Sequence, residues 1–158
     1  MTDKALTTCL WFDTPGEEAA TFYTAIVADS RLGHVHRYTE AGPGPVGAAM
    51  LVEFELNGQK FSALNGGPQH KFNESVSIVV PCADQAEVDY YWDSLLSGSG
   101  QEIACGWLKD KYGLCWQIVP TRIFEMIADP GKAARVTEAM FGMTKFDIAA
   151  LERAYAGG

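Results

Sequence analysis

The sequence predicts an α+β fold in which a β-α-β-β-β module occurs twice and is followed by helices. An apolar helical stripe appears at Ala19 and again 69 residues later at Val88, and each stripe follows an apolar run typical of a strand. Hydrophobic residues make up 47% of the 158 residues, which is enough for a core. We expect a single domain over residues 1–158, built from modules at 6–68 and 74–120 and helices at 121–158.

The first module begins with an apolar strand at residues 7–13. Thr14 is predicted as the helix N-cap and Glu17 as its capping-box partner. The helix presents its apolar residues at spacings of three and four: Ala19, Phe22, Tyr23, Ile26 and Val27. Three strands are expected at residues 31–39, 50–56 and 60–65. Asn57-Gly58 favours a two-residue hairpin turn between the last two.

The second module repeats this plan in a shorter form. After a strand at residues 75–80, Asp84 is the predicted N-cap and Glu87 its capping-box partner. The strands that follow are expected at residues 101–105, 106–110 and 114–119. Helices are then predicted at residues 121–128, 131–141 and 147–156. Their apolar residues need a surface to cover, within the subunit or on a partner, so we expect a homodimer.

The composition excludes several function classes. Twelve Lys and Arg against 20 Asp and Glu give a net charge of −8, which disfavours binding to nucleic acid. No apolar run approaches the roughly 20 residues of a membrane helix, so no membrane association is expected. The N-terminus lacks a basic region followed by an apolar core, which predicts a cytoplasmic protein. The four cysteines show no C-x-x-C spacing and are expected to be reduced thiols.

Several motifs in fixed order between Leu6 and Pro120 resemble one family. They are Ala63-Leu64-Asn65-Gly66-Gly67-Pro68, Phe72-Asn73-Glu74, Cys105-Gly106-Trp107-Leu108-Lys109-Asp110 and Trp116-Gln117-Ile118-Val119-Pro120. Together they are similar to the PhnB-like branch of the vicinal oxygen chelate, or glyoxalase, superfamily, which is often labelled 3-demethylubiquinone-9 3-methyltransferase-like. The resemblance implies that each module curls its sheet into a half-barrel and that, in metal-dependent members, inward-facing ligands meet on a divalent ion.

The methyltransferase label implies S-adenosylmethionine, which usually binds a doubly wound sheet with a Gly-rich turn directly after the first strand. The sequence has no such turn. The Gly-Pro run at residues 42–45 lies between strands, and the prolines remove amide donors, while residues 98–100 follow a helix. We therefore expect no cofactor and no methyl transfer.

The resemblance also implies four metal-ligand positions. They fall on Thr8, Ala63, Ser77 and Gln117, with Asn65 replacing Ala63 if the register differs by two. Hydroxyls and a carboxamide are poor ligands for zinc, nickel or iron, so we expect no metal at these positions. Trp107 and Cys115 complete the predicted pocket. The alternative is that Thr8, Ser77 and Gln117 only satisfy one another's hydrogen bonds.

Other polar residues offer further hypotheses. His34 and His36 stand two apart on one predicted strand face, which suits a metal site or, more ordinarily, a solvated face. Glu53 and Glu55 are interpreted as a solvated hairpin face. The loop at residues 40–47 is a candidate lid or an unstructured connection.

The leading hypothesis is a homodimeric PhnB-like protein that binds a small molecule without a metal at the usual site. Whether it also catalyses a reaction stays open at this point. A metal-dependent enzyme of glyoxalase or dioxygenase type, using His34 and His36, is the first alternative. A structural or regulatory dimer with a vestigial pocket is the second, because one fold hosts many functions.

Overall fold

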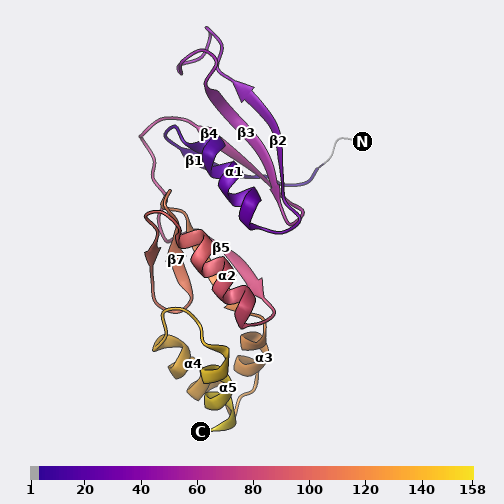
Figure 1. The fold of residues 1–158 in the computed structure, drawn as a ribbon, viewed down its shortest axis with the longest axis vertical. Helices are drawn as coiled ribbons and strands as arrows, with labels where there is room; N and C mark the ends of the chain where they lie inside the picture. The colour runs from indigo at the N-terminus through magenta and orange to yellow at the C-terminus, as the bar shows by residue number, and fades with distance from the viewer. Residues whose placement is uncertain (1–3) are drawn as a thin grey trace. The chain divides into compact units, whose positions relative to one another are not determined.

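The computed structural model describes residues 4–158 and divides the chain into two compact units, one ending at Lys71 and the other beginning at Phe72. Each unit has a four-stranded sheet with one helix packed against it, and the second also carries the C-terminal helices (Figure 1). The two predicted β-α-β-β-β modules and the helical tail are confirmed. Their grouping into a single domain stays a prediction.

The first unit has its strands in the order β1-β4-β3-β2. The elements are β1 (Thr8–Phe12), α1 (Gly16–Ile26), β2 (Arg31–Arg37), β3 (Ala49–Leu56) and β4 (Gln59–Asn65). β1 pairs in parallel with β4, whereas β4 with β3 and β3 with β2 are antiparallel. Helix α1 lies across one face of this sheet (Figure 1). The other face is not covered by a helix of the unit.

Alternation along the strands decides which side chains meet α1. Ala19, Ala20 and Tyr23 of the helix are fully buried, and the Tyr23 ring lies 6.4 Å from that of Phe54 on β3. The buried strand residues alternate with exposed ones, as expected for a sheet covered on one side. They are Leu10, Phe12, Val52, Phe54, Leu56, Phe61 and Ala63.

The start of α1 differs from the predicted capping box. The residue before the helix is Pro15, and no side chain of the local sequence caps it, so the prediction for Thr14 and Glu17 is wrong. Instead, the Gly16 amide donates to the Asn65 Oδ1 atom at 2.8 Å, and Asn65 Nδ2 donates to the Ala49 carbonyl. A distant strand residue therefore satisfies an amide that a local cap would otherwise bind.

The two connections around β3 are both ordered by specific residues. Asn57 and Gly58 have φ values of 44° and 80°, which confirms the predicted hairpin turn. In the loop at residues 40–47, Gly42 and Gly44 pack on the Tyr38 ring, and a Cβ at Gly44 would lie 2.4 Å from it. Tyr38 also donates its hydroxyl to the Asn65 carbonyl. The candidate lid is thus anchored at its start.

The second unit has its strands in the order β5-β8-β7-β6. The elements are β5 (Ser77–Cys82), α2 (Gln85–Leu96), β6 (Gln101–Glu102), β7 (Trp107–Lys109) and β8 (Cys115–Pro120). Asp84 caps α2 by accepting from the Glu87 amide at 2.9 Å, as predicted. The Glu87 carboxylate accepts from the amide of Ala83, one residue before the cap.

The turn between β7 and β8 is organised by Asp110, which is only 3% exposed. Its carboxylate accepts from the amides of Tyr112 and Leu114 and from the Trp116 indole Nε1 at 2.9 Å. Three N–H donors compensate the cost of burying the charge. Asp110 thereby ties the turn to the core.

The tail forms its own core within the second unit. It consists of α3 (Arg122–Ala128), α4 (Ala133–Phe141) and α5 (Ile148–Ala156). The buried cluster comprises Val119, Ile123, Met126, Val136, Phe146 and Leu151. The amides of Cys105 and Gly106 donate to the carbonyls of Met143 and Thr144, which joins the tail to the module. Phe124 and Phe141 remain exposed.

Candidate functional site

Three of the predicted site residues belong to the helix-covered side of the first sheet. Ala63 is fully buried, and a Cβ at Gly16 of α1 would lie 3.2 Å from its Cβ. Asn65 bonds the start of the same helix. Thr8 alternates with Leu10 and shares that side. None of the three faces the open side of the sheet, and their role as site residues stays a prediction.

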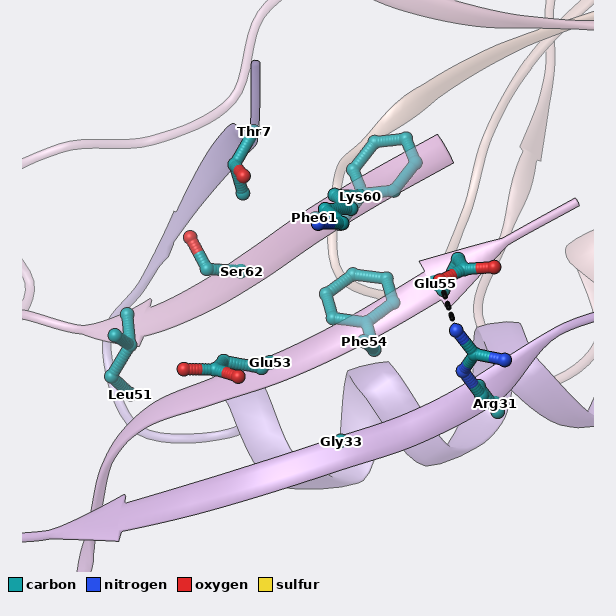
Figure 2. A pocket seen from close by; sticks show the side chains of 10 residues that line it. All are labelled: Thr7, Arg31, Gly33, Leu51, Glu53, Phe54, Glu55, Lys60, Phe61 and Ser62. Carbon is teal, nitrogen blue, oxygen red and sulfur yellow. Dashed lines mark hydrogen bonds and ion pairs between the residues drawn. The ribbon is translucent and has the colours of Figure 1, made fainter. Parts of the chain in front are cut away.

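The open face of the first sheet contains a hollow of about 390 Å³. Figure 2 shows side chains converging on it from β2, β3, β4 and the residue before β1. Its lining consists of Thr7, Arg31, Gly33, Leu51, Glu53, Phe54, Glu55, Lys60, Phe61 and Ser62. A hollow of this size is typical of a small-molecule site.

Thr7 and Ser62 line the hollow and were not named in the sequence analysis. Each is a direct neighbour of a predicted residue, Thr8 or Ala63, so a shift of one position moves the site to the opposite face. Within residues 4–158 neither hydroxyl has a hydrogen-bond partner. The buried Leu10 and Phe12 alternate with Cys9 and Trp11, and this alternation was the signal for the correct register.

The charges of the hollow are arranged along β3. Arg31 Nη2 lies 2.7 Å from Glu55 Oε2, as the dashed line in Figure 2 marks. Lys60 is the cross-strand partner of Glu55, and Ser62 is that of Glu53. Glu55 therefore lies between two cationic residues, whereas Glu53 has a neutral neighbour across the strand.

His36 holds the Glu53 carboxylate from the neighbouring strand. The His36 Nε2 and Glu53 Oε1 atoms are 2.9 Å apart, and the His34 ring lies 4.4 Å from that of His36. The hydrogen bond from His36 lowers the pKa of Glu53. A register shift in β2 between Leu32 and Val35 accompanies this arrangement. Glu53 is therefore a carboxylate at neutral pH.

The second sheet brings together three predicted site residues. Gln117 Nε2 donates to Ser77 Oγ at 2.8 Å, and Trp107 is the cross-strand partner of Gln117. All three are half-buried. The mutual bond between Ser77 and Gln117 agrees with the alternative in which such residues satisfy each other, and it leaves the Gln117 carbonyl oxygen for other donors.

Cys115 does not line an open pocket, because it is fully buried. Its cross-strand partner is Lys109, which forms an ion pair with Glu74. Burial raises the pKa of the Cys115 thiol, and it raises that of Cys82 to about 12, with Glu87 and Asp84 contributing. Neither thiol has the character of a nucleophile.

Thiol reactivity gives a direct check of this arrangement. At pH 8 we expect a soluble maleimide to label Cys9 first, since Cys9 is exposed, and Cys82 and Cys115 only after unfolding. Mass spectrometry of the labelled protein measures this, with Cys9→Ser as the control. Early labelling of Cys82 would contradict the burial.

Because the folded-state pKa of Cys82 lies above its ordinary value of 9.0, the free energy of unfolding should fall as the pH rises from about 9 to 12.

The donor atoms do not fit the divalent metal that the superfamily implies. Thr7 and Ser62 offer hydroxyls, and Ser77 and Gln117 a hydroxyl and a carboxamide, none of which is a ligand of catalytic zinc or iron. Across residues 4–158 no three or more His, Cys, Asp and Glu residues form a group that could hold a metal ion. His34, His36 and Glu53 are close without forming such a group.

S-adenosylmethionine does not fit the first strand–helix turn either. The Gly16 amide at the start of α1 already binds Asn65 Oδ1, so it cannot bind an anionic or carboxylate group of a cofactor. The sheets are mixed and four-stranded and lack the doubly wound order.

In the described part of the chain, no helix is long and apolar enough to cross a lipid bilayer.

Comparisons with solved structures agree with this fold. A putative 3-demethylubiquinone-9 3-methyltransferase, the PhnB protein of Bacillus cereus, is 33% identical over 75% of this chain and 100% of its own, with a TM-score of 0.67. Protein PA1353 of Pseudomonas aeruginosa is 16% identical over 72% and 95% of the two chains, with a TM-score of 0.58.

A third structure shares the fold. The fosfomycin resistance protein FosX of Mesorhizobium loti is 10% identical over 81% of this chain and 99% of its own, with a TM-score of 0.57. No curated protein matches the sequence. The family model described as 3-demethylubiquinone-9 3-methyltransferase matches residues 4–119. The chain therefore belongs to this PhnB-like family.

Proposed function

We propose that the protein binds a small organic molecule on the open face of its first sheet and does so without a metal. The observation that carries the proposal is the hollow of about 390 Å³, in which the Ser62 hydroxyl lies across the strand from a carboxylate held by His36. Within residues 4–158 the hydroxyls of Thr7 and Ser62 have no hydrogen-bond partner. Polar groups without protein partners are those that a ligand can satisfy.

The chemistry of the donors favours binding over metal-assisted catalysis. Glu53 and Glu55 are held by His36 and Arg31, and the hydroxyls are neutral, so the hollow can orient a ligand by hydrogen bonds and charge. The open face of the second sheet offers Trp107 beside the Ser77–Gln117 pair as a further polar and aromatic surface.

We further propose a cytoplasmic homodimer, in which the exposed Phe124 and Phe141 lie at the subunit contact.

The proposal is tested with protein dialysed against a chelator. A library of small polar metabolites is screened by thermal melting, and hits are repeated with Ser62→Trp, which fills the hollow, and with Ser62→Thr as the matched control. We expect at least one compound to raise the melting temperature of the metal-free protein and of Ser62→Thr but not that of Ser62→Trp, because binding stabilises the folded state.

Two outcomes would contradict the proposal. Stabilisation that requires added zinc, nickel, manganese or iron and disappears in His36→Ala would favour the metal-dependent enzyme. A library in which no compound distinguishes Ser62→Thr from Ser62→Trp would favour a structural dimer with a vestigial pocket.

A further inference from the structure

The Ser62 hydroxyl is a buried polar group without a protein partner. Ser62 is 8% exposed, and within residues 4–158 its hydroxyl takes part in no hydrogen bond. It lies on β4 in the lining of the hollow, with Glu53 of β3 as its cross-strand neighbour (Figure 2). Because buried polar groups are normally satisfied, an unpartnered hydroxyl that lines a hollow indicates a polar group of a ligand.

The carboxylates of the hollow also have unused acceptor atoms. His36 Nε2 lies 2.9 Å from Glu53 Oε1, and Arg31 Nη2 donates to Glu55 Oε2 at 2.7 Å. From residues 4–158 no hydrogen bond reaches the other oxygen of either carboxylate. An ionised carboxylate accepts hydrogen bonds but cannot donate them. A ligand that satisfies these oxygens must therefore carry O–H or N–H donors.

The lining has no formal excess of charge of either sign. Its charged side chains are two cations and two carboxylates, Arg31 and Lys60 against Glu53 and Glu55. The hydroxyls of the lining are neutral, and each can both donate and accept a hydrogen bond. A neutral molecule with several hydroxyl groups matches this set, because it donates to the carboxylates and exchanges hydrogen bonds with the hydroxyls.

The open face of the first sheet also offers an apolar row beside this polar one. Cross-strand pairing across β3, β4 and β1 gives a polar row and an apolar row, which are Glu53–Ser62–Cys9 and Leu51–Leu64–Trp11. The rows are two residues apart on each strand, or about 6 to 7 Å. Trp11 is half-buried, and its indole N–H donates to the Gly67 carbonyl at 2.8 Å, which fixes the ring.

We infer that the ligand is a neutral cyclic molecule with several hydroxyl groups, such as a monosaccharide or a cyclitol. Its hydroxyls bind at Glu53 and Ser62, and the C–H groups of its ring lie toward Leu51 and Trp11, where they bury apolar area. A six-membered ring with its hydroxyl groups is about as wide as the distance between the two rows. The inference rests on the proposed function and specifies its ligand class.

A panel of six-membered rings tests the ligand class. Binding of myo-inositol, glucose, galactose and mannose to the metal-free, isotope-labelled protein is measured by chemical-shift titration. The references are cyclohexanol, which has a single hydroxyl, glucosamine, which is a cation, and glucuronate, which is an anion. We expect at least one neutral polyol to bind more tightly than every reference, by roughly fivefold or more, because it makes additional hydrogen bonds.

The indole N–H signal of Trp11 reports where the polyol binds. Trp11 is the only tryptophan in residues 1–71, and loss of one indole signal in Trp11→Phe identifies it. We expect this signal to shift on titration with the best polyol, because the apolar row lies next to the hollow.

Side-chain variants test the polar row. Ser62→Ala should lower the affinity for the best polyol roughly fivefold, whereas Ser62→Thr, which keeps the hydroxyl, should retain it. Glu53→Gln should also lower the affinity roughly fivefold, because it replaces an acceptor oxygen with a donor. Glu17→Gln, which alters a carboxylate paired with Arg37 outside the hollow, is its matched control and should change nothing.

The outcomes distinguish this inference from the proposed function. A reference that binds as tightly as the best polyol would overturn the inference, and so would polyol binding that leaves the Trp11 signal and the affinity of Ser62→Ala unchanged. The inference also fails, while the proposed function stands, if no polyol binds and another metabolite loses its stabilising effect in Ser62→Trp. If the hollow binds no compound of either set, both fail.

Discussion

Replacing Asp110 by alanine is expected to lower the free energy of unfolding of the second unit by about 3 to 5 kcal/mol. The change removes the acceptor of two backbone amides and of the Trp116 indole, and Asp110 is 3% exposed, so water has poor access to the orphaned donors. Trp116 is itself fully buried, and the change removes the carboxylate that its indole N–H donates to. Urea denaturation followed by tryptophan fluorescence measures the loss.

Asp110→Asn is the matched variant for this prediction. The carboxamide keeps an oxygen for the Tyr112 and Leu114 amides but presents an NH₂ group to Trp116, so an intermediate loss is expected. A loss below about 1 kcal/mol in Asp110→Ala would mean that the donors find other partners, and the role given to the carboxylate would then be wrong.

Gly106→Ala is expected to destabilise the junction between the second module and its tail by about 2 to 4 kcal/mol. Gly106 has a φ of 77°, and a Cβ there would lie 2.3 Å from Phe146 Cε2 and 3.0 Å from the Ile118 carbonyl oxygen. The methyl group must therefore displace Phe146 from the tail core. Thermal melting and limited proteolysis measure the effect, with cleavage expected first in the tail.

Gly113→Ala separates the two causes of this loss. Gly113 has a similar φ of 87°, but nothing lies within 4 Å of an added Cβ, so only the backbone cost of about 1 to 2 kcal/mol is expected. Equal losses in the two variants would show that Phe146 is not displaced. Equal protease sensitivity of the tail in both would lead to the same conclusion.

Secondary structure followed closely from local patterns in the sequence. The stripe beginning at Val88 and the Asn57-Gly58 turn depend on neighbours along the chain, and both were confirmed. The start of α1 was mispredicted because its amide binds Asn65, which is 49 residues away. A local rule cannot detect a partner supplied by a different strand.

The candidate site was harder to predict because it depends on strand parity. Thr7 and Thr8 are chemically alike, yet alternation puts them on opposite faces of the sheet. Ser62 and Ala63 also lie on opposite faces. Glu53 and Glu55 were interpreted as a solvated face. The hollow that they line forms only when β2 and β4 bring Arg31, His36 and Lys60 beside them.

The parallel pairing of β1 with β4 has a consequence for how the chain folds during synthesis. Thr8 pairs with Phe61, so the first strand has no partner until 53 further residues have been made. The antiparallel strands β2, β3 and β4 are joined by shorter connections and can pair earlier, because closing a shorter loop costs less entropy. Since Thr7 directly precedes β1, the hollow is completed only at this last step, after the rest of its lining is in place.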